Sequence, residues 1–275
     1  MSPAHRFGYY PVCHAGCGSL ACNVHFLPRL PAPVSSLTLV ALIMAGELHW
    51  GYEGETGPDN WGSLSPDYAL CAEGTAQSPI DIRDASELDL VAIHFDYGET
   101  PNSVTNTGHS IQVNVEGDSH ILYNGIRYNL LQFHFHAPSE HTIDGQAAAM
   151  EVHFVHQDPN SGTLAVVGIL LEGGEVDNEA YAPVFGNLPT EAGRTVNTDD
   201  SLALSGLLPQ ARTFYTYQGS LTTPPCSENV RWLLLDTPVT LSAAQIAAYT
   251  AIYANNARPV QPLGDRDLLR DSEQT

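Results

Sequence analysis

The sequence predicts a mostly β fold with minor helices in one domain of about 225 residues. Strand-like runs dominate it, turn residues separate most of these runs, and no internal repeat or long low-complexity linker divides them. In chain order, the expected strands are 90–95, 110–115, 120–122, 126–136, 147–156, 163–171, 212–217 and 230–235. One helix is expected after Ser242, because Ser242 and Gln245 form a capping-box pattern ahead of Ile246 and Tyr249.

The first 45 residues are expected to lie outside this domain, which then spans 46–275. Residues 36–45 form a short apolar run behind Arg29 that ends in small residues, and no acidic residue precedes Glu47. This pattern predicts a secretory signal segment, too short to cross a membrane as a helix, with cleavage near Ala45. The upstream stretch 1–30 is longer than a signal needs, so it is either a disordered extension or the product of a misplaced start codon.

The chain is strongly acidic. Its net charge is −21, and its ten cationic side chains are all arginine. Removing Arg6 and Arg29 with the N-terminal segment makes the remaining domain more negative still. Nucleic acid and anionic membrane surfaces are therefore poor partners. A lysine-free acidic surface also suits a saline setting, although genomic base composition alone can favour Arg over Lys.

Two histidines on one predicted strand are the main candidates for a metal site. This strand carries Gln132-Phe133-His134-Phe135-His136, and successive side chains of a strand point to opposite faces, so His134 and His136 project together. If the strand over 147–156 pairs antiparallel with it, His153 joins them. Three neutral imidazole nitrogens then converge on one point and leave the fourth position of zinc open for water, as in a catalytic site.

The alternative is that these histidines are ordinary core or surface residues, since the chain has twelve. Burying two basic rings side by side without a partner is costly, which favours a metal for the pair. Gln132 and Glu151 share the strand faces of the candidate ligands and can accept their outer ring N–H groups. By the same parity His156 points to the opposite face, and it is expected to be structural along with His141.

A second constellation is Gly219-Ser220-Leu221-Thr222-Thr223-Pro224-Pro225, which alone is more typical of a rigid surface turn than of a functional site. Together with the histidines and Ser139-Glu140-His141-Thr142, it makes the chain resemble the alpha-class carbonic anhydrases, in their secreted bacterial form, from about 49 to 270. The other matching segments are Trp50-Gly51-Tyr52, Trp61-Gly62, Gln77-Ser78-Pro79-Ile80-Asp81-Ile82, Asn106-Thr107-Gly108-His109, Leu164-Ala165-Val166-Val167-Gly168 and Arg258-Pro259-Val260-Gln261-Pro262.

The resemblance implies a large twisted, mainly antiparallel central sheet with zinc at the base of a conical cleft. It implies the following ligands and supporting groups: His134, His136 and His153 on zinc, supported by Gln132, Glu151 and the backbone carbonyl of Asn256. Thr222 would accept a hydrogen bond from the zinc-bound hydroxide while donating its own proton to Glu140. Because a hydroxyl has one proton, an ionised Glu140 leaves Thr222 able only to accept from the nucleophile.

His109 matches the proton shuttle of the family, and an imidazole with an ordinary pKa near 6.5 can both take and release a proton. Without the resemblance it would be an ordinary surface histidine. The implied pocket for carbon dioxide consists of Val155, Val166, Leu221, Thr223, Val230 and Trp232, each of which would otherwise be a core residue. Anions and sulfonamide-type inhibitors are the other ligands that the resemblance implies at the zinc.

Cys71 and Cys226 lie where secreted and bacterial relatives carry an intramolecular disulfide, which the resemblance implies here. A disulfide and a signal segment both indicate a secreted or periplasmic location. The spacing of Cys13, Cys17 and Cys22, near His14 and His25, fits no standard zinc finger.

The sequence thus predicts a zinc carbonic anhydrase that interconverts carbon dioxide and bicarbonate, with slow ester hydrolysis as a side activity of the same hydroxide. One alternative is a non-catalytic binding module of the same fold, as arises when a zinc ligand is lost. Another is a zinc hydrolase for a different substrate, although no polar motif that would read such a substrate is present. Secreted bacterial relatives are often homodimers, but no surface of this sequence can be assigned to an interface.

Overall fold

The computed structural model describes residues 49–272. The predicted signal segment and the three N-terminal cysteines lie outside the described residues. Among residues 49–272, no helix is both long enough and apolar enough to cross a membrane.

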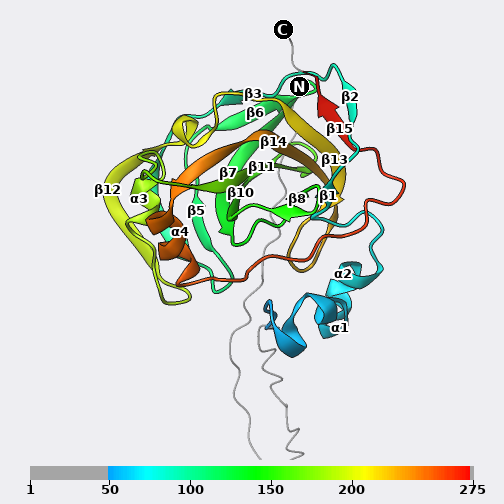
Figure 1. Cartoon of the computed structure of the whole chain (residues 1–275), viewed down its shortest axis with the longest axis horizontal. Helices are drawn as coiled ribbons and strands as arrows, with labels where there is room; N and C mark the ends of the chain where they lie inside the picture. The colour runs from blue at the N-terminus through cyan, green and yellow to red at the C-terminus, as the bar shows by residue number, and fades with distance from the viewer. Residues whose placement is uncertain (1–48, 273–275) are drawn as a thin grey trace, which may run out of the picture. The chain divides into compact units, whose positions relative to one another are not determined.

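A mixed sheet of twelve strands dominates the described part of the chain (Figure 1). Its main path runs in the order β12-β4-β5-β7-β10-β11-β14-β13-β15-β2, and β6 pairs with both β7 and β3. The bounds of its strands are β2 Ser86–Leu88, β3 His94–Asp96, β4 Glu99–Asn106, β5 Ile111–Asn114, β6 His120–Tyr123, β7 Ile126–His136, β10 Met150–Gln157, β11 Leu164–Gly174, β12 Thr195–Ala203, β13 Phe214–Ser220, β14 Glu228–Ser242 and β15 Leu269–Asp271.

Most neighbouring strands of this sheet are antiparallel, as expected. The two parallel pairs are β11 with β14 and β15 with β2. A smaller sheet of three short strands has the order β1-β8-β9, with bounds β1 Asp81–Ile82, β8 Thr142–Ile143 and β9 Gln146–Ala147.

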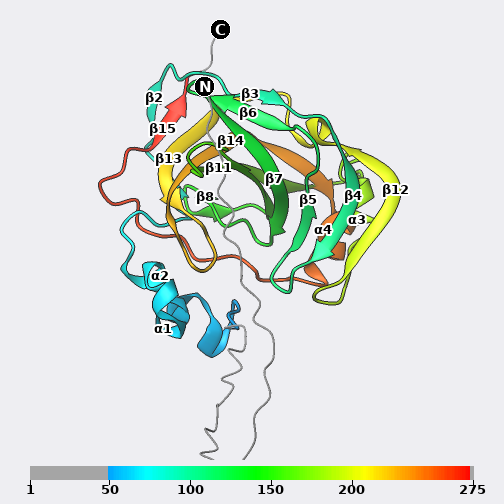
Figure 2. The ribbon, with the colours of Figure 1, turned by 180° about the vertical axis from the view of Figure 1, so that it is seen from behind.

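The helices of the described residues are short. They are α1 Trp61–Leu64, α2 Leu70–Glu73, α3 Ala182–Phe185 and α4 Ala243–Thr250, with 3-10 turns at Gly54–Thr56, Pro58–Asn60, Pro66–Tyr68 and Leu204–Leu207. The capping box that predicts α4 is present, since the Ser242 hydroxyl accepts from the Gln245 N–H and the Gln245 side chain accepts from the Ser242 N–H. Helices α3 and α4 lie side by side in both views of the ribbon (Figures 1 and 2).

The two faces of the central strands bury different groups. One face contributes Phe133, Phe135, Val152 and Phe154 to the larger hydrophobic cluster. The opposite face carries the three candidate histidine ligands and a smaller apolar cluster that includes Trp232. Both faces are covered, which explains why β10 is buried along nearly its whole length.

The predicted strand over 90–95 is wrong for most of its length, because only its last two residues lie in β3. The Leu90 N–H donates to the Asp271 carboxylate instead of joining a strand ladder. The short strands β1, β2, β8 and β15 escaped prediction. So did β4 and β12, which pair with each other, with β12 at the edge of the sheet. Both are polar, and β4 contains Pro101, which argues against a strand in a sequence.

Candidate metal centre

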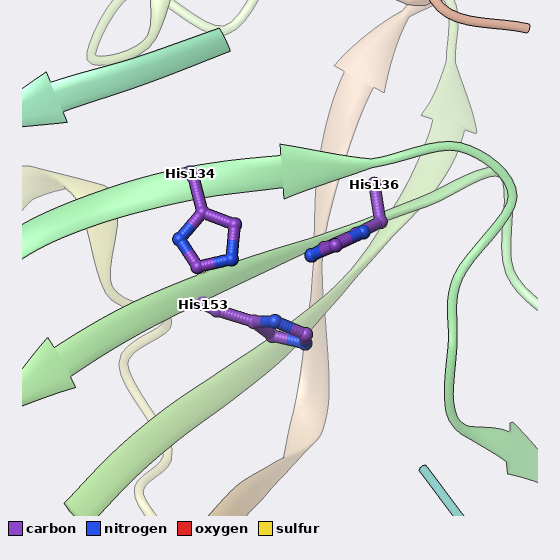
Figure 3. A group of neighbouring side chains, drawn as sticks. All are labelled: His134, His136 and His153. Carbon is purple, nitrogen blue, oxygen red and sulfur yellow. The ribbon is translucent and has the colours of Figure 1, made fainter. Parts of the chain in front are cut away.

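Three histidines from two adjacent strands meet on one face of the sheet. His134 and His136 lie on β7, and antiparallel pairing with β10 puts His153 directly opposite His134. The three rings turn toward one another (Figure 3). One nitrogen of each ring lies within 4.8 Å of those of the other two. The predicted pairing of the strands over 126–136 and 147–156 is therefore confirmed.

The outer nitrogen of each ring has an acceptor. The pairs are His134 Nδ1 with Gln132 Oε1 at 2.8 Å, His136 Nδ1 with the Asn256 carbonyl at 2.7 Å, and His153 Nε2 with Glu151 Oε1 at 2.8 Å. Because amide and carboxylate oxygens only accept, each of these nitrogens carries the proton. The bare nitrogens are then Nε2 of His134, Nε2 of His136 and Nδ1 of His153, which face the common centre.

The site fits a zinc ion. Nε2 of His136 is buried without a hydrogen-bond partner, which is costly unless an ion takes its lone pair. Burial lowers the pKa of His134 and His153, and it lowers that of His136 to about 4, so all three rings favour the neutral form that binds metal. Three neutral imidazoles in this arrangement match a zinc site with one open position.

A second cluster, His141 with Glu151 and His153, is a hydrogen-bond network that supports the site. His141 Nδ1 is 2.7 Å from Glu151 Oε1 and its Nε2 is 2.7 Å from the Tyr217 hydroxyl, so neither nitrogen is free for an ion. Glu151 Oε2 accepts the N–H groups of Glu140 and His141. This agrees with the structural role expected for His141.

The Glu151 carboxylate is held in its charged form. Burial alone would raise its pKa, but the electrostatic interactions with the His141 and His153 rings and the hydrogen bonds from both rings hold it well below the usual range. Gly168 of β11 lies opposite His153, and a Cβ there would come within 3.0 Å of Glu151 Oε1. Glycine is therefore required for the close approach of this carboxylate.

Glu140 and Thr222, the predicted pair that orients the nucleophile, are both buried, and the Glu140 carboxylate lies 3.5 Å from His136 Nδ1 and 3.8 Å from His153 Nδ1. Burial raises the Glu140 pKa to about 7, against the lowering effects of His153, the Arg258 N–H and the Thr222 hydroxyl. The Arg258 N–H donates to Glu140 Oε1 at 2.8 Å. Among the described residues, Glu140 Oε2 has no hydrogen-bond partner. The expected hydrogen bond from the Thr222 hydroxyl to this carboxylate is therefore not formed, although Thr222 lies near enough to lower the Glu140 pKa.

The candidate shuttle His109 shares a cavity of about 170 Å³ with His134, His136 and Thr223. Its ring stacks on Trp50 with a centroid separation of 3.7 Å, and its Nε2 is 2.9 Å from the Trp50 carbonyl. Since a carbonyl only accepts, Nε2 carries the proton and Nδ1 is left to accept one.

The structure brings the predicted apolar pocket residues together. Five of them belong to the smaller hydrophobic cluster or pack against it: Val155, Val166, Leu221, Val230 and Trp232. The indole of Trp232 lies 4.8 Å from the His153 ring, measured between centroids, so this cluster adjoins the candidate metal centre. Thr223 lines the cavity on the side of the other two histidines.

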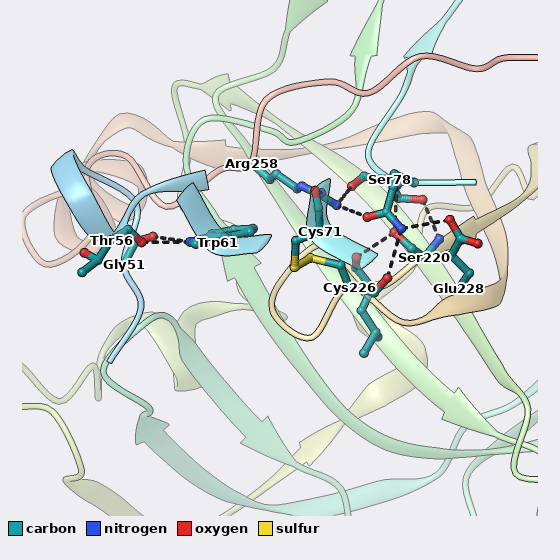
Figure 4. Close-up of a disulfide and its surroundings, with 11 residues drawn as sticks. Gly51, Thr56, Trp61, Cys71, Ser78, Ser220, Cys226, Glu228 and Arg258 are labelled. Atoms are coloured by element: carbon teal, nitrogen blue, oxygen red, sulfur yellow. Dashed lines mark hydrogen bonds between the residues drawn. A yellow bond between two sulfur atoms is a disulfide. The ribbon is translucent and has the colours of Figure 1, made fainter. Parts of the chain in front are cut away.

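A disulfide joins Cys71 and Cys226, the pair that the resemblance implies (Figure 4). It connects the N-terminal part of the described residues to the loop that carries Thr222. Arg258, which the sequence marked only as part of a matching segment, is buried beside it. Its guanidinium donates to the Cys71 and Ser78 carbonyls and to the Gln77 side chain at 2.8–2.9 Å.

Sequence reasoning also missed a buried link from the histidines to the Thr222 loop. The Tyr217 hydroxyl bonds to both His141 and Ser78, and Ser78 Oγ accepts the Ser220 N–H. Ser220 Oγ in turn accepts the Ser78 N–H. Residue type alone cannot reveal this link, because Tyr217 and Ser78 are 139 positions apart in the chain.

The comparisons with known proteins agree with this geometry. A family model described as eukaryotic-type carbonic anhydrase matches residues 56–272. A carbonic anhydrase of Nostoc sp. is 43% identical over 82% of this chain and 87% of its own length, and one of Pectobacterium carotovorum is 41% identical over 81% and 91%.

Among solved structures, the alpha-carbonic anhydrase of Thermovibrio ammonificans, in complex with the inhibitor sulfanilamide, has a TM-score of 0.79 and 42% identity. The match covers 82% of this chain and all of that one. Both the family model and these relatives cover most of the described residues. This chain therefore belongs to the eukaryotic-type, or alpha-class, carbonic anhydrase family.

Proposed function

We propose that this carbonic anhydrase catalyses the zinc-dependent, reversible hydration of carbon dioxide to bicarbonate and a proton, with slow ester hydrolysis as a side activity. The observation that carries the proposal is the set of three bare imidazole nitrogens, of which Nε2 of His136 is buried without a partner. His134, His136 and His153 would hold the zinc. When bound, zinc makes hydroxide available from water near neutral pH.

Thr222 and Glu140 would orient the nucleophile. An ionised Glu140 takes the single proton of the Thr222 hydroxyl, so that Thr222 accepts from the hydroxide and directs its lone pair toward the substrate. The nearness of Thr222 to this carboxylate, whose pKa it lowers, supports the pair. The Thr222 N–H would face a substrate oxygen or an anionic inhibitor.

The apolar cluster beside His153 would hold carbon dioxide, a small molecule without net charge that needs no polar clamp. Bicarbonate, inorganic anions and sulfonamide-type inhibitors would take the neighbouring polar side, near Thr222 and Thr223. The structure of the Thermovibrio ammonificans relative in complex with the inhibitor sulfanilamide supports the binding of sulfonamide-type inhibitors.

His109 would move the product proton to buffer. Its Nδ1 would accept the proton, while its Nε2–H donates to the Trp50 carbonyl. The residue is partly exposed and borders the same cavity as two of the ligands, as a shuttle between the site and solvent requires.

We propose a secreted or periplasmic location for the mature enzyme, spanning about 46–275 after loss of the N-terminal segment. The Cys71–Cys226 disulfide supports an oxidising compartment. A homodimer is compatible with this proposal, and light scattering of the mature chain would measure it.

Stopped-flow assays of carbon dioxide hydration test the proposal. The zinc-loaded wild type should hydrate carbon dioxide, and His109→Ala should lower the maximal rate in weak buffer by at least about tenfold. This is less than the roughly hundredfold or more typical of one acid-base group, because water and residual buffer also take the proton. Added imidazole should partly restore the variant, because it replaces the lost proton acceptor. An unchanged rate in dilute buffer would remove His109 from the mechanism.

A further inference from the structure

Asn256 lies in the segment after α4 and is 1% exposed. Its backbone carbonyl accepts from His136 Nδ1, and its side chain makes further hydrogen bonds to the backbones of Ala137 and His109. These contacts reach two groups with different tasks, a candidate zinc ligand and the candidate proton shuttle.

On the metal side, Asn256 is paired with the residue that follows His136. Its N–H donates to the Ala137 carbonyl at 3.1 Å, and its Oδ1 accepts the Ala137 N–H at 2.9 Å. These two bonds brace the Asn256 backbone against the end of β7. They therefore fix the direction in which its carbonyl meets His136 Nδ1, 2.7 Å away.

On the shuttle side, the Asn256 amide nitrogen is surrounded by three oxygens. It lies 3.0 Å from the His109 carbonyl, 3.1 Å from the Phe135 carbonyl and 2.9 Å from the Tyr249 hydroxyl. An amide group has only two hydrogens to donate, so both are engaged. The amide thereby ties the backbone of His109 to β7, the strand that carries His134 and His136.

We propose that Asn256 is a positioning residue that sets the orientation of the His136 ligand and the place of the His109 shuttle together. Among residues 49–272 it alone is hydrogen-bonded to both. This inference rests on the proposed function and deepens it: metal retention and proton transfer share one buried side chain.

The test uses the zinc-loaded chain and two measurements. The first is the rate of zinc release to a chelator, which needs no catalysis. The second is the ratio of kcat at high imidazole to kcat at low imidazole, which does not depend on how much enzyme has kept its zinc. Asn256→Ala should release zinc about tenfold faster, the size seen when the group supporting a ligand is removed, and should raise the buffer ratio at least threefold.

Two control variants separate the effect on zinc release from the effect on proton transfer. Asn106→Ala removes an equally buried asparagine that bonds to the Gly108 N–H and to Tyr253 in the shuttle loop, and it should release zinc as the wild type does. Gln132→Ala removes the acceptor of His134 Nδ1. It should release zinc faster and leave the buffer ratio unchanged.

Asn256→Asp serves if the alanine variant folds poorly. It keeps the oxygen that accepts from Ala137 and replaces only the donor amide, so it should retain zinc within about threefold of the wild type and still raise the buffer ratio. The inference is overturned if Asn256→Ala changes only one measurement, or lowers the melting temperature and changes neither. A wild type that keeps zinc without hydrating carbon dioxide would instead overturn the proposed function.

Discussion

What each buried histidine does depends on the hydrogen-bond partners of its two ring nitrogens. The candidate ligands each have one nitrogen bonded to an acceptor and one left bare, whereas both nitrogens of His141 are bonded. His156 resembles His141 in this respect: its Nε2 is 2.7 Å from the Tyr97 hydroxyl and its Nδ1 is 3.3 Å from the Ala165 carbonyl. Fully buried in the core, it matches its predicted structural role.

His156 should make the fold sensitive to acid. Burial lowers its pKa to about 3, against about 6.5 in an unfolded chain, so between these values the unfolded chain binds more protons. Stability is therefore complete above pH 6.5 and falls as pH decreases, by roughly 1 kcal/mol per pH unit. His156→Gln should show a shallower loss of unfolding free energy between pH 6.5 and 5 in urea titrations. Parallel slopes for variant and wild type would contradict this.

Much of the site was predictable at this scale, because alternation along two strands assigns the histidines, Gln132 and Glu151 to one face. The role of the Asn256 side chain was not predictable. It depends on a loop returning to β7 from 120 positions away, and no local pattern encodes that contact.

At the scale of elements, the pairs β7 with β10 and β10 with β11 build the centre. Alternation along β7 and β10 favoured their pairing. The capping box of Ser242 and Gln245 independently predicted helix α4. The polar strand β12 and the proline-containing strand β4 could not be predicted from local signals. Each is held in place by pairing with the other at the edge of the sheet.

The end of β13, at Gly219, has no room for a larger side chain. A Cβ on Gly219 would overlap Ser78 Oγ and lie 2.8 Å from the Trp232 ring, so Gly219→Ala must displace these side chains or the strand that leads to Thr222. We expect a loss of about 1–3 kcal/mol of unfolding free energy in urea titrations. Gly98→Ala is the control, since its Cβ would meet only Ser119 Oγ at 3.9 Å. Equal losses in the two variants would contradict the close packing at Gly219.

At the scale of the whole domain, three distant segments hold the loop that carries Thr222. The disulfide closes a loop of 155 residues, and the buried Arg258 connects Cys71, Gln77 and Ser78 to the backbone that contacts Glu140. In the chain-entropy model such a loop contributes on the order of 4 kcal/mol, although measured gains are often smaller. Sequence resemblance could imply the disulfide, but the buried arginine that bridges these segments emerges only from the folded chain.

The central claim is that the three histidines hold a zinc ion on which hydration depends. The most direct measurement is stopped-flow hydration of carbon dioxide by the mature domain before zinc removal, after removal by a chelator, and after zinc is restored. The account predicts one zinc per chain, loss of hydration with the metal, and its return on reloading. Hydration that persists without metal, or that is absent from the zinc-loaded enzyme, would contradict it.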